Sequence, residues 1–203
     1  GKIASHTNNS KWITSAESRL DVHKLRNENQ AILVGVNTVV HDDPELTTRI
    51  SNGRNPIRII MDSTLKIPLE SKVLNDKQAE TWVFTTESCD TGKKKQVEEL
   101  GAKVFMAGTS QVDPSIVLKV LGENLVSSLL IEGGGTINAA FLENKLVDKA
   151  IFYVAPKLIG GKDSPSFFGG TGMAKMADAI ELNGLTVTQF GPDFKFTGYP
   201  KYK

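Results

Sequence analysis

Short apolar runs that alternate with amphipathic segments constrain the fold of this chain more than any other feature. Three of these runs are bounded by polar or glycine residues and are too short for helices: residues 31–36 (AILVGV), 56–62 (PIRIIMD) and 81–86 (TWVFTT). A continuous apolar run is typical of a strand buried on both faces, as in a parallel sheet covered by helices. The pattern therefore predicts an α/β fold.

Helix signals lie between and around the predicted strands. Helices are predicted over residues 15–28, 93–100 and 113–124, and from about residue 136 after a further strand, SSLLIEG. Thr14 stands three residues before Glu17, in the spacing of a capping box. Asp113 and Pro114 suit the cap and first position of a helix, and Gly101 suits a helix stop. Strands and helices therefore alternate.

The pattern changes in the last third of the chain. Residues 149–159, 185–191 and 194–200 look like strands without intervening helices, which predicts antiparallel strands added to the edge of the sheet. A glycine-rich loop, IGGKDSPSFFGGTG, separates them and has the length of a functional or mobile loop. We therefore expect a three-layer αβα fold with a mostly parallel central sheet and antiparallel C-terminal strands. No linker is found, so residues 1–203 are treated as a single domain.

Composition excludes several classes of partner. The chain has 24 basic and 23 acidic residues, so it carries no global field that would favour nucleic acid or an anionic membrane surface. No apolar run approaches the roughly 20 residues of a membrane span, and the N-terminus does not read as a signal peptide. The single cysteine, Cys89, cannot form an internal disulfide. A reducing compartment, the cytoplasm, is therefore expected.

A glycine turn after a predicted strand is the first candidate site. In LLIEGGGTINAAFLENKLVD, Glu132 precedes three glycines that open a helix. Free N–H groups at a helix start can hold a phosphate or pyrophosphate without a basic side chain. The spacing is neither a dinucleotide fingerprint nor a Walker loop, and the glycines could equally serve close packing of strand and helix. The carboxyl end of a parallel strand is nevertheless where open α/β sheets bind ligands.

Other candidate residues have equally plain alternatives. Arg26 and Arg49 suit a phosphorylated or carboxylated substrate, but each could be an ordinary surface arginine. Trp12 could belong to the core or stack on a flat ring. Asp42 and Asp43 lack a third metal ligand nearby, so turn chemistry is favoured over a metal. The three histidines (His6, His23 and His41) read as surface residues, and no Ser-His-Asp or Cys-His arrangement is found.

Taken together, five stretches carry a resemblance to a known family: SKWITS, ILVGVNTVVHDDPELTTR, PIRIIMDS, IEGGGTINAAFL and FYVAPKLIGG. In this order, from Gly1 to about Tyr199, the chain resembles the reductase domain of the bifunctional riboflavin-biosynthesis deaminase/reductase. The resemblance implies a dihydrofolate reductase-like fold. It also implies the NADPH-dependent reduction of 5-amino-6-(5-phosphoribosylamino)uracil, in which a hydride delivered to the ribose C1 carbon turns the ribosyl group into the ribityl group.

The resemblance also assigns residues. It places substrate contacts at Ser10, Arg26, Leu46, Arg49 and Glu132. It places cofactor contacts at Trp12, Thr38, Asp42 and Ser63, and along the helix start formed by Gly134, Gly135, Thr136, Ile137, Asn138, Ala139 and Ala140. The proton donor stays open between bound water, a substrate hydroxyl and Glu132, which is the one catalytic candidate. Thr85, Thr86 or residues 93–95 could meet the 2′-phosphate of NADPH.

Several expectations concern the wider protein. The family continues upstream through a strand ending near SLDG and is normally fused to a zinc deaminase domain; this chain begins within that motif and is expected to lack both. It has no H-x-E with P-C-x-x-C, so deamination and a metal are not predicted. The resemblance suggests a homo-oligomer. Two alternatives are kept, an NADPH-dependent pterin or folate reductase and a non-catalytic nucleotide-binding or assembly module.

Overall fold

The computed structural model describes residues 1–203, which form two compact units. The first unit contains Gly1–Val22 and Gly134–Lys203, and the second contains His23–Gly133. The chain therefore passes from the first unit to the second inside helix α1 (Ala16–Glu28) and returns between Gly133 and Gly134. The prediction of a single domain stays a prediction.

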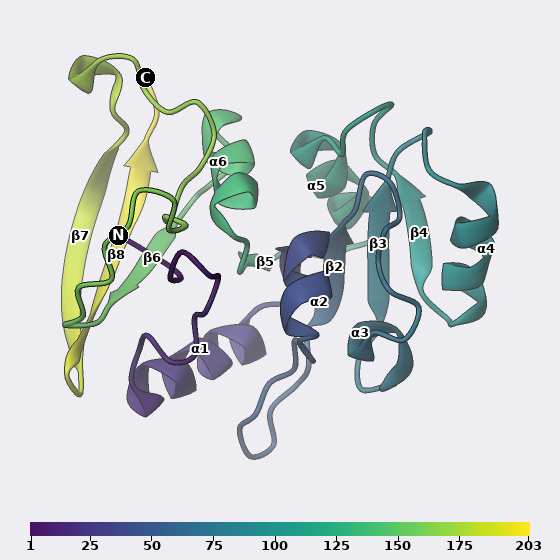
Figure 1. Ribbon diagram of the computed structural model, residues 1–203, viewed down its shortest axis with the longest axis horizontal. Helices are drawn as coiled ribbons and strands as arrows, with labels where there is room; N and C mark the ends of the chain where they lie inside the picture. Colours follow the sequence, from purple (N-terminus) through teal and green to yellow (C-terminus); the bar gives the residue numbers. More distant parts are fainter. The chain divides into compact units, whose positions relative to one another are not determined.

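The second unit is built around a five-stranded parallel sheet with strand order β4-β3-β2-β1-β5. Figure 1 labels β2, β3, β4 and β5 of this sheet. Its strands are β1 (Ala31–Gly35), β2 (Ile57–Met61), β3 (Thr81–Thr85), β4 (Lys103–Met106) and β5 (Leu129–Ile131). The connecting helices are α2 (Val36–Asp42), α3 (Lys72–Asn75), α4 (Thr91–Glu99) and α5 (Pro114–Glu123). The predicted α/β class with a parallel sheet is confirmed.

The three central strands are the ones that the sequence predicts best, because they are buried along nearly their whole length. Side chains of both faces reach the core, so the apolar run is continuous rather than alternating. Ile32, Val34, Ile60 and Val83 of these strands pack with Val97 of α4 in one core cluster. These four strand residues share one face of the sheet, so helix α4 covers that face.

Three elements of this unit were not predicted from the sequence: helix α2, helix α3 and strand β4. Helix α2 contains several β-branched residues, which are weak helix formers, so its sequence indicates a turn region rather than a helix. It forms because Val36 and Val39, three residues apart, both enter the core. Strand β4 lies at the sheet edge and is only partly buried, so it lacks a continuous apolar run.

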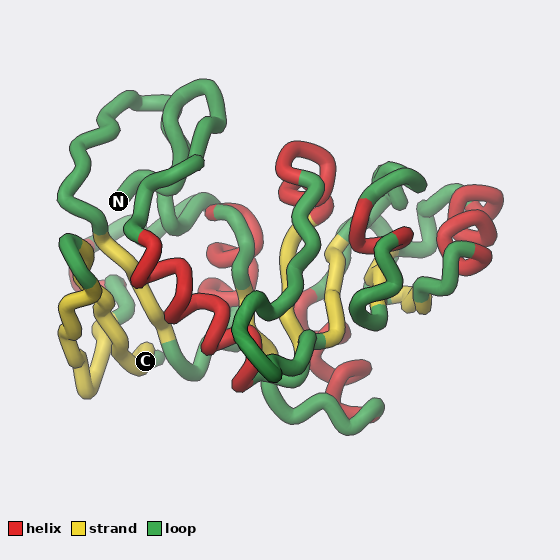
Figure 2. The backbone as a smooth tube through the Cα atoms, turned by 90° about the horizontal axis from the view of Figure 1, so that it is seen from below, coloured by secondary structure: helices red, strands yellow, loops and turns green.

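The first unit contains a three-stranded antiparallel sheet with order β6-β8-β7, formed by β6 (Ala150–Val154), β7 (Glu181–Phe190) and β8 (Asp193–Lys201). The antiparallel C-terminal strands are confirmed, but they form a sheet of their own rather than an extension of the parallel sheet. Figure 2 shows long loops beside this sheet. The segment between β6 and β7 contains only the 3-10 helix η1 (Met176–Asp178), as expected for an irregular loop.

The start of helix α1 is fixed to the antiparallel sheet by a buried carboxylate. Asp193 accepts hydrogen bonds from the Ser15 N–H at 2.6 Å and from the Ser18 hydroxyl at 2.7 Å. Burial alone would raise the pKa of Asp193, but these hydrogen bonds outweigh it and lower the pKa. The helix cap is Ser15, whose Oγ accepts from the Ser18 N–H, and not Thr14 as the capping-box spacing predicted.

A second carboxylate ties the middle of α1 to the same sheet. Asp21 accepts a hydrogen bond from the Tyr153 hydroxyl of β6 at 2.5 Å and pairs with Lys195 Nζ of β8 at 2.6 Å. The Lys195 ammonium also lies 5.7 Å from the centre of the Tyr153 ring. Because both charged side chains are mostly buried, this contact fixes the helix more firmly than an exposed ion pair would.

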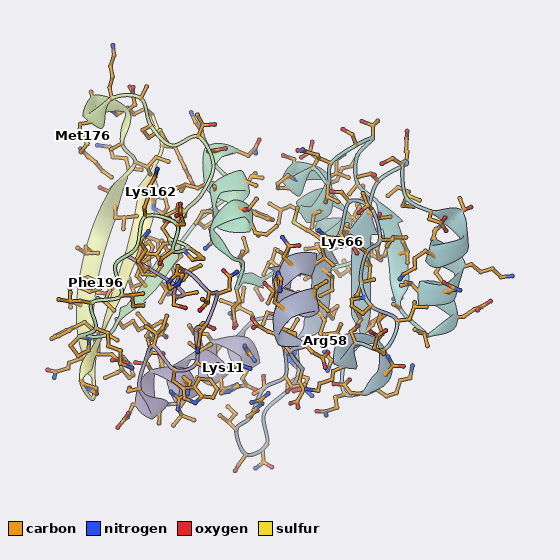
Figure 3. The ribbon with its side chains drawn as sticks, in the orientation of Figure 1. Lys11, Arg58, Lys66, Lys162, Met176 and Phe196 are labelled. Atoms are coloured by element: carbon orange, nitrogen blue, oxygen red, sulfur yellow. The ribbon has the colours of Figure 1, made fainter.

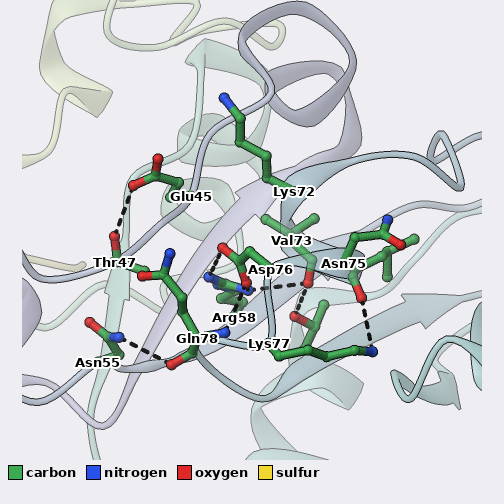
Figure 4. A network of polar contacts seen from close by, with 12 residues as sticks. Glu45, Thr47, Asn55, Arg58, Lys72, Val73, Asn75, Asp76, Lys77 and Gln78 are labelled. Atoms are coloured by element: carbon green, nitrogen blue, oxygen red, sulfur yellow. Dashed lines mark hydrogen bonds and ion pairs between the residues drawn. The ribbon is translucent and has the colours of Figure 1, made fainter.

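The second unit contains one fully buried arginine, Arg58 of β2, labelled in Figure 3. Its guanidinium donates to both carboxylate oxygens of Asp76 at 2.7 Å and to the Val73 carbonyl at 3.2 Å (Figure 4). These contacts tie strand β2 to helix α3 and the residue that follows it. No helix of the structure is both long and apolar enough to cross a bilayer.

Candidate functional site

The order of the parallel strands defines where this sheet can bind a ligand. Strand β1 lies between β2 and β5, so the chain continues from β1 to one side and returns to β5 on the other. At such a switch point the connections leave in opposite directions, and a crevice opens at the carboxyl ends of the two strands. Glu132 follows β5 directly at this end, and its N–H donates to the Leu33 carbonyl of β1 at 2.9 Å. The backbone of Glu132 is therefore fixed at the switch point.

The side chain of Glu132 is held by Arg26, the arginine near the end of α1. Arg26 Nε donates to Glu132 Oε1 at 2.8 Å, and Nη2 donates to Oε2 at 2.6 Å. Nη1 donates to the Thr47 carbonyl at 3.0 Å. The two side chains are only 14% and 23% exposed. The paired hydrogen bonds of a planar guanidinium fix both the position and the plane of the carboxylate.

Burial and pairing act in opposite directions on Arg26. Burial alone would lower the pKa of Arg26, but the hydrogen bonds to Glu132 and its negative charge outweigh this and raise the pKa. Arg26 is thus a permanent cation in this site. The sequence singled out both residues as substrate contacts but did not predict their pairing, because they stand 106 positions apart.

The loop after α2 brings two further predicted substrate residues into the second unit. Leu46 is buried and has a positive φ of 52°, a conformation that non-glycine residues seldom adopt. Arg49 pairs with Glu45 at 3.0 Å, and its side chain is 57% exposed. Arg49 therefore presents an accessible guanidinium, unlike Arg26.

His23 joins this group and was missed as a site residue by the sequence analysis. It lies one helical turn before Arg26 on α1, and its Nδ1 atom is buried without a hydrogen-bond partner. Burial and the positive charges of Arg26 and Arg49 lower the pKa of His23, while Glu132 and the Thr47 backbone act in the opposite direction. The surroundings of His23 therefore favour its neutral form. The only sequence signal was its spacing of three residues from Arg26.

We expect His23 to make folding stability depend on pH. Because its pKa is lowered in the folded chain, the unfolded chain takes up a proton first as the pH falls below about 6.5, and stability decreases through that window. His23→Gln, which cannot ionise, should reduce this decrease. Urea unfolding at pH 7.5 and pH 5.5 measures the decrease in stability, and His41→Gln, at an exposed position, is the control. An equal pH dependence in wild type and His23→Gln contradicts the prediction.

The predicted cofactor residues of the second unit follow the carboxyl ends of two parallel strands. Thr38 and Asp42 lie on α2, which begins after β1, and Ser63 follows β2. The Ser63 carbonyl accepts hydrogen bonds from the hydroxyls of Thr85 at 3.3 Å and Thr86 at 2.8 Å. These two threonines therefore hold the turn at Ser63 in place. The sequence analysis named the same two side chains as candidates for binding the 2′-phosphate of NADPH.

Of the two adjacent aspartates, Asp43 has a role in the local structure. Asp43 ends α2 in a left-handed conformation, and its carboxylate accepts from the Lys72 N–H at 2.9 Å. It also lies 3.5 Å from Lys72 Nζ. No group of three or more His, Cys, Asp or Glu residues is placed to hold a metal ion. The contacts of Asp43 at the end of α2 therefore account for this residue as part of a turn.

In the first unit, helix α6 (Gly135–Glu143) carries the predicted pyrophosphate site. Its N-cap, Gly134, makes no side-chain cap, and an added Cβ there would meet nothing within 4 Å. An added Cβ on Gly135 would come within 2.8 Å of the Ser166 carbonyl oxygen and 2.9 Å of the Gly169 nitrogen. The sequence left two roles open for the glycine cluster, close packing and phosphate binding. Gly135 serves close packing, whereas Gly134 leaves the start of the helix open for a ligand.

The remaining residues of this helix have different surroundings. The Asn138 side chain donates to the Phe167 carbonyl at 2.9 Å, and Ala139 is buried. The side chains of Asn138 and Ala139 therefore hold the helix in the unit. Any contribution of this segment to a ligand comes from the backbone N–H groups of its first turn.

The N-terminal segment of the first unit presents an exposed aromatic ring. Trp12 is 62% exposed, and its carbonyl accepts a hydrogen bond from Lys157 Nζ at 2.7 Å. Ser10 precedes it in a turn in which the Ile13 N–H donates to the Ser10 carbonyl at 3.1 Å. A cavity of about 290 Å³ lies in the same unit, lined among others by Lys2, Ile13, Tyr153, Lys157, Leu158 and Phe167. Trp12 is thus a surface residue and not part of the core.

Comparisons with known proteins agree on one family. A family model described as the RibD C-terminal domain matches residues 1–196. The riboflavin biosynthesis protein RibD of Bacillus amyloliquefaciens is 42% identical over 202 residues, which cover 99% of this chain and 54% of that protein. A 2,5-diamino-6-ribosylamino-4(3H)-pyrimidinone 5′-phosphate reductase of Methanothermobacter thermautotrophicus is 39% identical over 185 residues, which cover 90% of this chain and 84% of that protein.

A solved structure gives the same answer for the fold. The diaminohydroxyphosphoribosylaminopyrimidine deaminase/5-amino-6-(5-phosphoribosylamino)uracil reductase of Thermotoga maritima superposes with a TM-score of 0.79 at 28% identity, covering 99% of this chain and 53% of that one. The chain thus spans about half the length of the Bacillus and Thermotoga proteins.

Proposed function

Because the chain belongs to the RibD C-terminal domain family, we propose that it is the NADPH-dependent pyrimidine reductase of riboflavin biosynthesis. The reaction converts the ribosyl group of 5-amino-6-(5-phosphoribosylamino)uracil into the ribityl group. The observation that carries the proposal is the family match, which extends over residues 1–196. The carboxylate of Glu132, held by Arg26 at the switch point of the parallel sheet, supports it from the structure.

Each unit, taken by itself, contains residues whose chemistry suits parts of a nicotinamide dinucleotide phosphate. The open, uncapped start of α6 at Gly134 suits a pyrophosphate, and the exposed indole of Trp12 suits a flat ring. In the second unit, Thr38, Asp42 and Ser63 have hydroxyl and carboxylate groups that can bind polar parts of a nucleotide, and their role as cofactor contacts stays a prediction. When bound, NADPH supplies the hydride. Its choice over NADH is part of the proposal.

In this proposal Glu132 orients the substrate. Each of its carboxylate oxygens already accepts one hydrogen bond from Arg26, and each keeps a lone pair for a ribose hydroxyl or a uracil N–H. Opening of the ribose ring to an imine exposes C1 to the hydride, and Arg26 keeps the carboxylate fixed during that change. Arg49 holds the phosphate with its accessible guanidinium.

We also propose that the chain self-associates and works together with a deaminase domain. Exposed apolar side chains on the antiparallel strands, Leu185, Val187 and Phe194, offer a surface for a second copy. The chain spans about half of the RibD relative, which leaves room in such a protein for another domain. Location in the cytoplasm stays a prediction, consistent with a buried, unpaired Cys89.

An assay of NADPH oxidation tests the proposed function. The wild-type chain is mixed with NADPH and, in separate reactions, with 5-amino-6-(5-phosphoribosylamino)uracil, with 2,5-diamino-6-ribosylamino-4(3H)-pyrimidinone 5′-phosphate and with dihydrofolate. Loss of NADPH absorbance with the uracil compound supports the proposal. Turnover of the diamino compound alone would identify that compound as the substrate instead. Turnover of dihydrofolate alone would identify a folate reductase. NADPH binding without turnover of any substrate would favour a binding module.

Arg49→Ala should raise KM for the phosphorylated substrate by about 10- to 100-fold, the size expected for a lost charge-assisted hydrogen bond. Arg49 is the better residue for testing whether an arginine binds the substrate phosphate. Replacing Arg26 would also remove the partner that holds Glu132. Steady-state kinetics with the phosphorylated substrate and its dephosphorylated form measure the effect, and only the phosphorylated form should respond. Arg54→Ala, an exposed arginine of the same unit, is the control. An unchanged KM in Arg49→Ala would exclude binding of the substrate phosphate by Arg49.

A further inference from the structure

The indole of Trp12 is exposed but not free, because an arginine lies on one of its faces. Arg19 Cζ is 4.4 Å from the centre of the Trp12 ring, within the range of a cation–π contact. The ring is nevertheless 62% exposed. A large aromatic side chain that is held in place and still open to solvent is more typical of a binding surface than of packing.

Arg19 is itself fixed at both ends of its side chain. Its backbone belongs to α1, whose start is anchored by Asp193, and its Nη1 donates to the Thr14 carbonyl at 2.6 Å. The side chain is half-buried, so its position is not that of a freely rotating surface arginine. Arg19 can therefore transmit the fixed position of the helix to the indole.

The backbone of Trp12 is held from a second direction. Lys157, three residues after β6, donates from Nζ to the Trp12 carbonyl at 2.7 Å. Ring and backbone are thus each held by a side chain from a different part of the first unit. A ring that is already oriented loses little conformational entropy when a ligand stacks on it, which is how preorganisation strengthens binding.

We infer that Arg19 is a positioning residue that holds the Trp12 indole by its guanidinium, so that the indole can stack on a flat heteroaromatic ring of the nicotinamide cofactor. The inference rests on the proposed function for the identity of the cofactor. It adds Arg19, which neither the sequence motifs nor the family resemblance assigned. Arg19 acts through Trp12 and makes no contact with the reacting atoms.

The test is a double-mutant cycle on NADPH binding, measured by isothermal titration calorimetry with wild type, Arg19→Met, Trp12→Ala and the double variant. Methionine keeps an unbranched apolar side chain but removes the charge. We expect Arg19→Met to raise the Kd for NADPH by about 3- to 10-fold, the size of a partly exposed cation–π contact. In the Trp12→Ala background the same change should have no further effect. Arg19→Lys should retain part of the affinity.

Kinetics and stability separate positioning from a general structural role. Arg19→Met should raise KM for NADPH while kcat at saturating NADPH stays within about twofold, and its urea unfolding midpoint should match that of the control Arg54→Met. An Arg19→Met Kd equal to that of wild type overturns the inference. So does an equal loss of affinity in the Trp12→Ala background, because Arg19 would then not act through Trp12. A wild-type chain that does not bind NADPH at all would instead refute the proposed cofactor.

Discussion

Replacing Asp76 with asparagine is expected to lower the free energy of unfolding by about 3 kcal/mol, the size found when one partner of a buried ion pair is removed. The Arg58 side chain is 0% exposed, and Asp76 supplies the only carboxylate that it contacts. Asparagine keeps one oxygen as an acceptor but turns an NH₂ group toward the guanidinium. The buried positive charge is then left without compensation.

Urea unfolding followed by circular dichroism measures this loss at neutral pH. The matched control is Glu98→Gln, which makes the same kind of change in an exposed pair with Lys94 on α4 and should alter stability by less than about 0.5 kcal/mol. Replacing both Arg58 and Asp76 by leucine should recover much of the lost stability, because no unpaired charge remains. A loss below about 1 kcal/mol in Asp76→Asn would show that Arg58 finds another partner.

The same pair sets an acid limit to stability. Burial alone would raise the pKa of Asp76, but the hydrogen bonds and charge of Arg58 and the Gln78 N–H outweigh it and lower the pKa. The stability that the pair contributes is therefore present above the ordinary aspartate pKa and is lost as the pH falls below it. Since Asp193 also has a lowered pKa, both units are expected to lose stability in this range.

The sequence predicted those parts of the fold whose signals are local. Strands β1, β2 and β3 were found because both of their faces are buried, and α5 was found because its cap, Asp113, and Pro114 are neighbours in the chain. Helix α2 was missed because its β-branched residues are helical only through burial of Val36 and Val39. The separate antiparallel sheet was not predicted, since strand order depends on pairing between distant segments and not on the pattern within each one.

The residues of the candidate site were also predictable only where their sequence signals are local. Glu132 could be singled out because it directly follows a strand at a glycine turn, and Arg49 because it ends a turn-rich segment. That Arg26 holds Glu132 and leaves Arg49 accessible depends on side-chain placement, which no local pattern encodes. His23 was read as a surface residue because its spacing from Arg26 means little until the charge on Glu132 is known to lie beside it.

Replacing Glu132 with glutamine is expected to lower kcat/KM for the phosphoribosylaminopyrimidine by about 10²- to 10⁴-fold, the range of a positioned acid, base or charge-stabilising carboxylate. Glutamine has nearly the same size, so the packing around the side chain is preserved. It removes the negative charge and one of the two oxygens that Arg26 holds. Steady-state kinetics give the two parameters separately. A fall in kcat would mean that the carboxylate acts in the transition state, whereas a rise in KM alone would mean that it only binds.

The Arg26→Met variant tests whether Arg26 acts through Glu132 or contacts the substrate independently. If Arg26 acts by holding Glu132, the double variant should be about as impaired as Glu132→Gln alone, because the two changes remove one shared interaction. If Arg26 contacts the substrate phosphate separately, the losses should multiply, and Arg26→Met should discriminate between phosphorylated and dephosphorylated substrate as Arg49→Ala does. Circular dichroism of each variant checks that it is folded, and Glu98→Gln again provides the control for loss of a carboxylate. A kcat/KM within about threefold of wild type in Glu132→Gln would remove Glu132 from the reaction and leave it as the structural partner of Arg26.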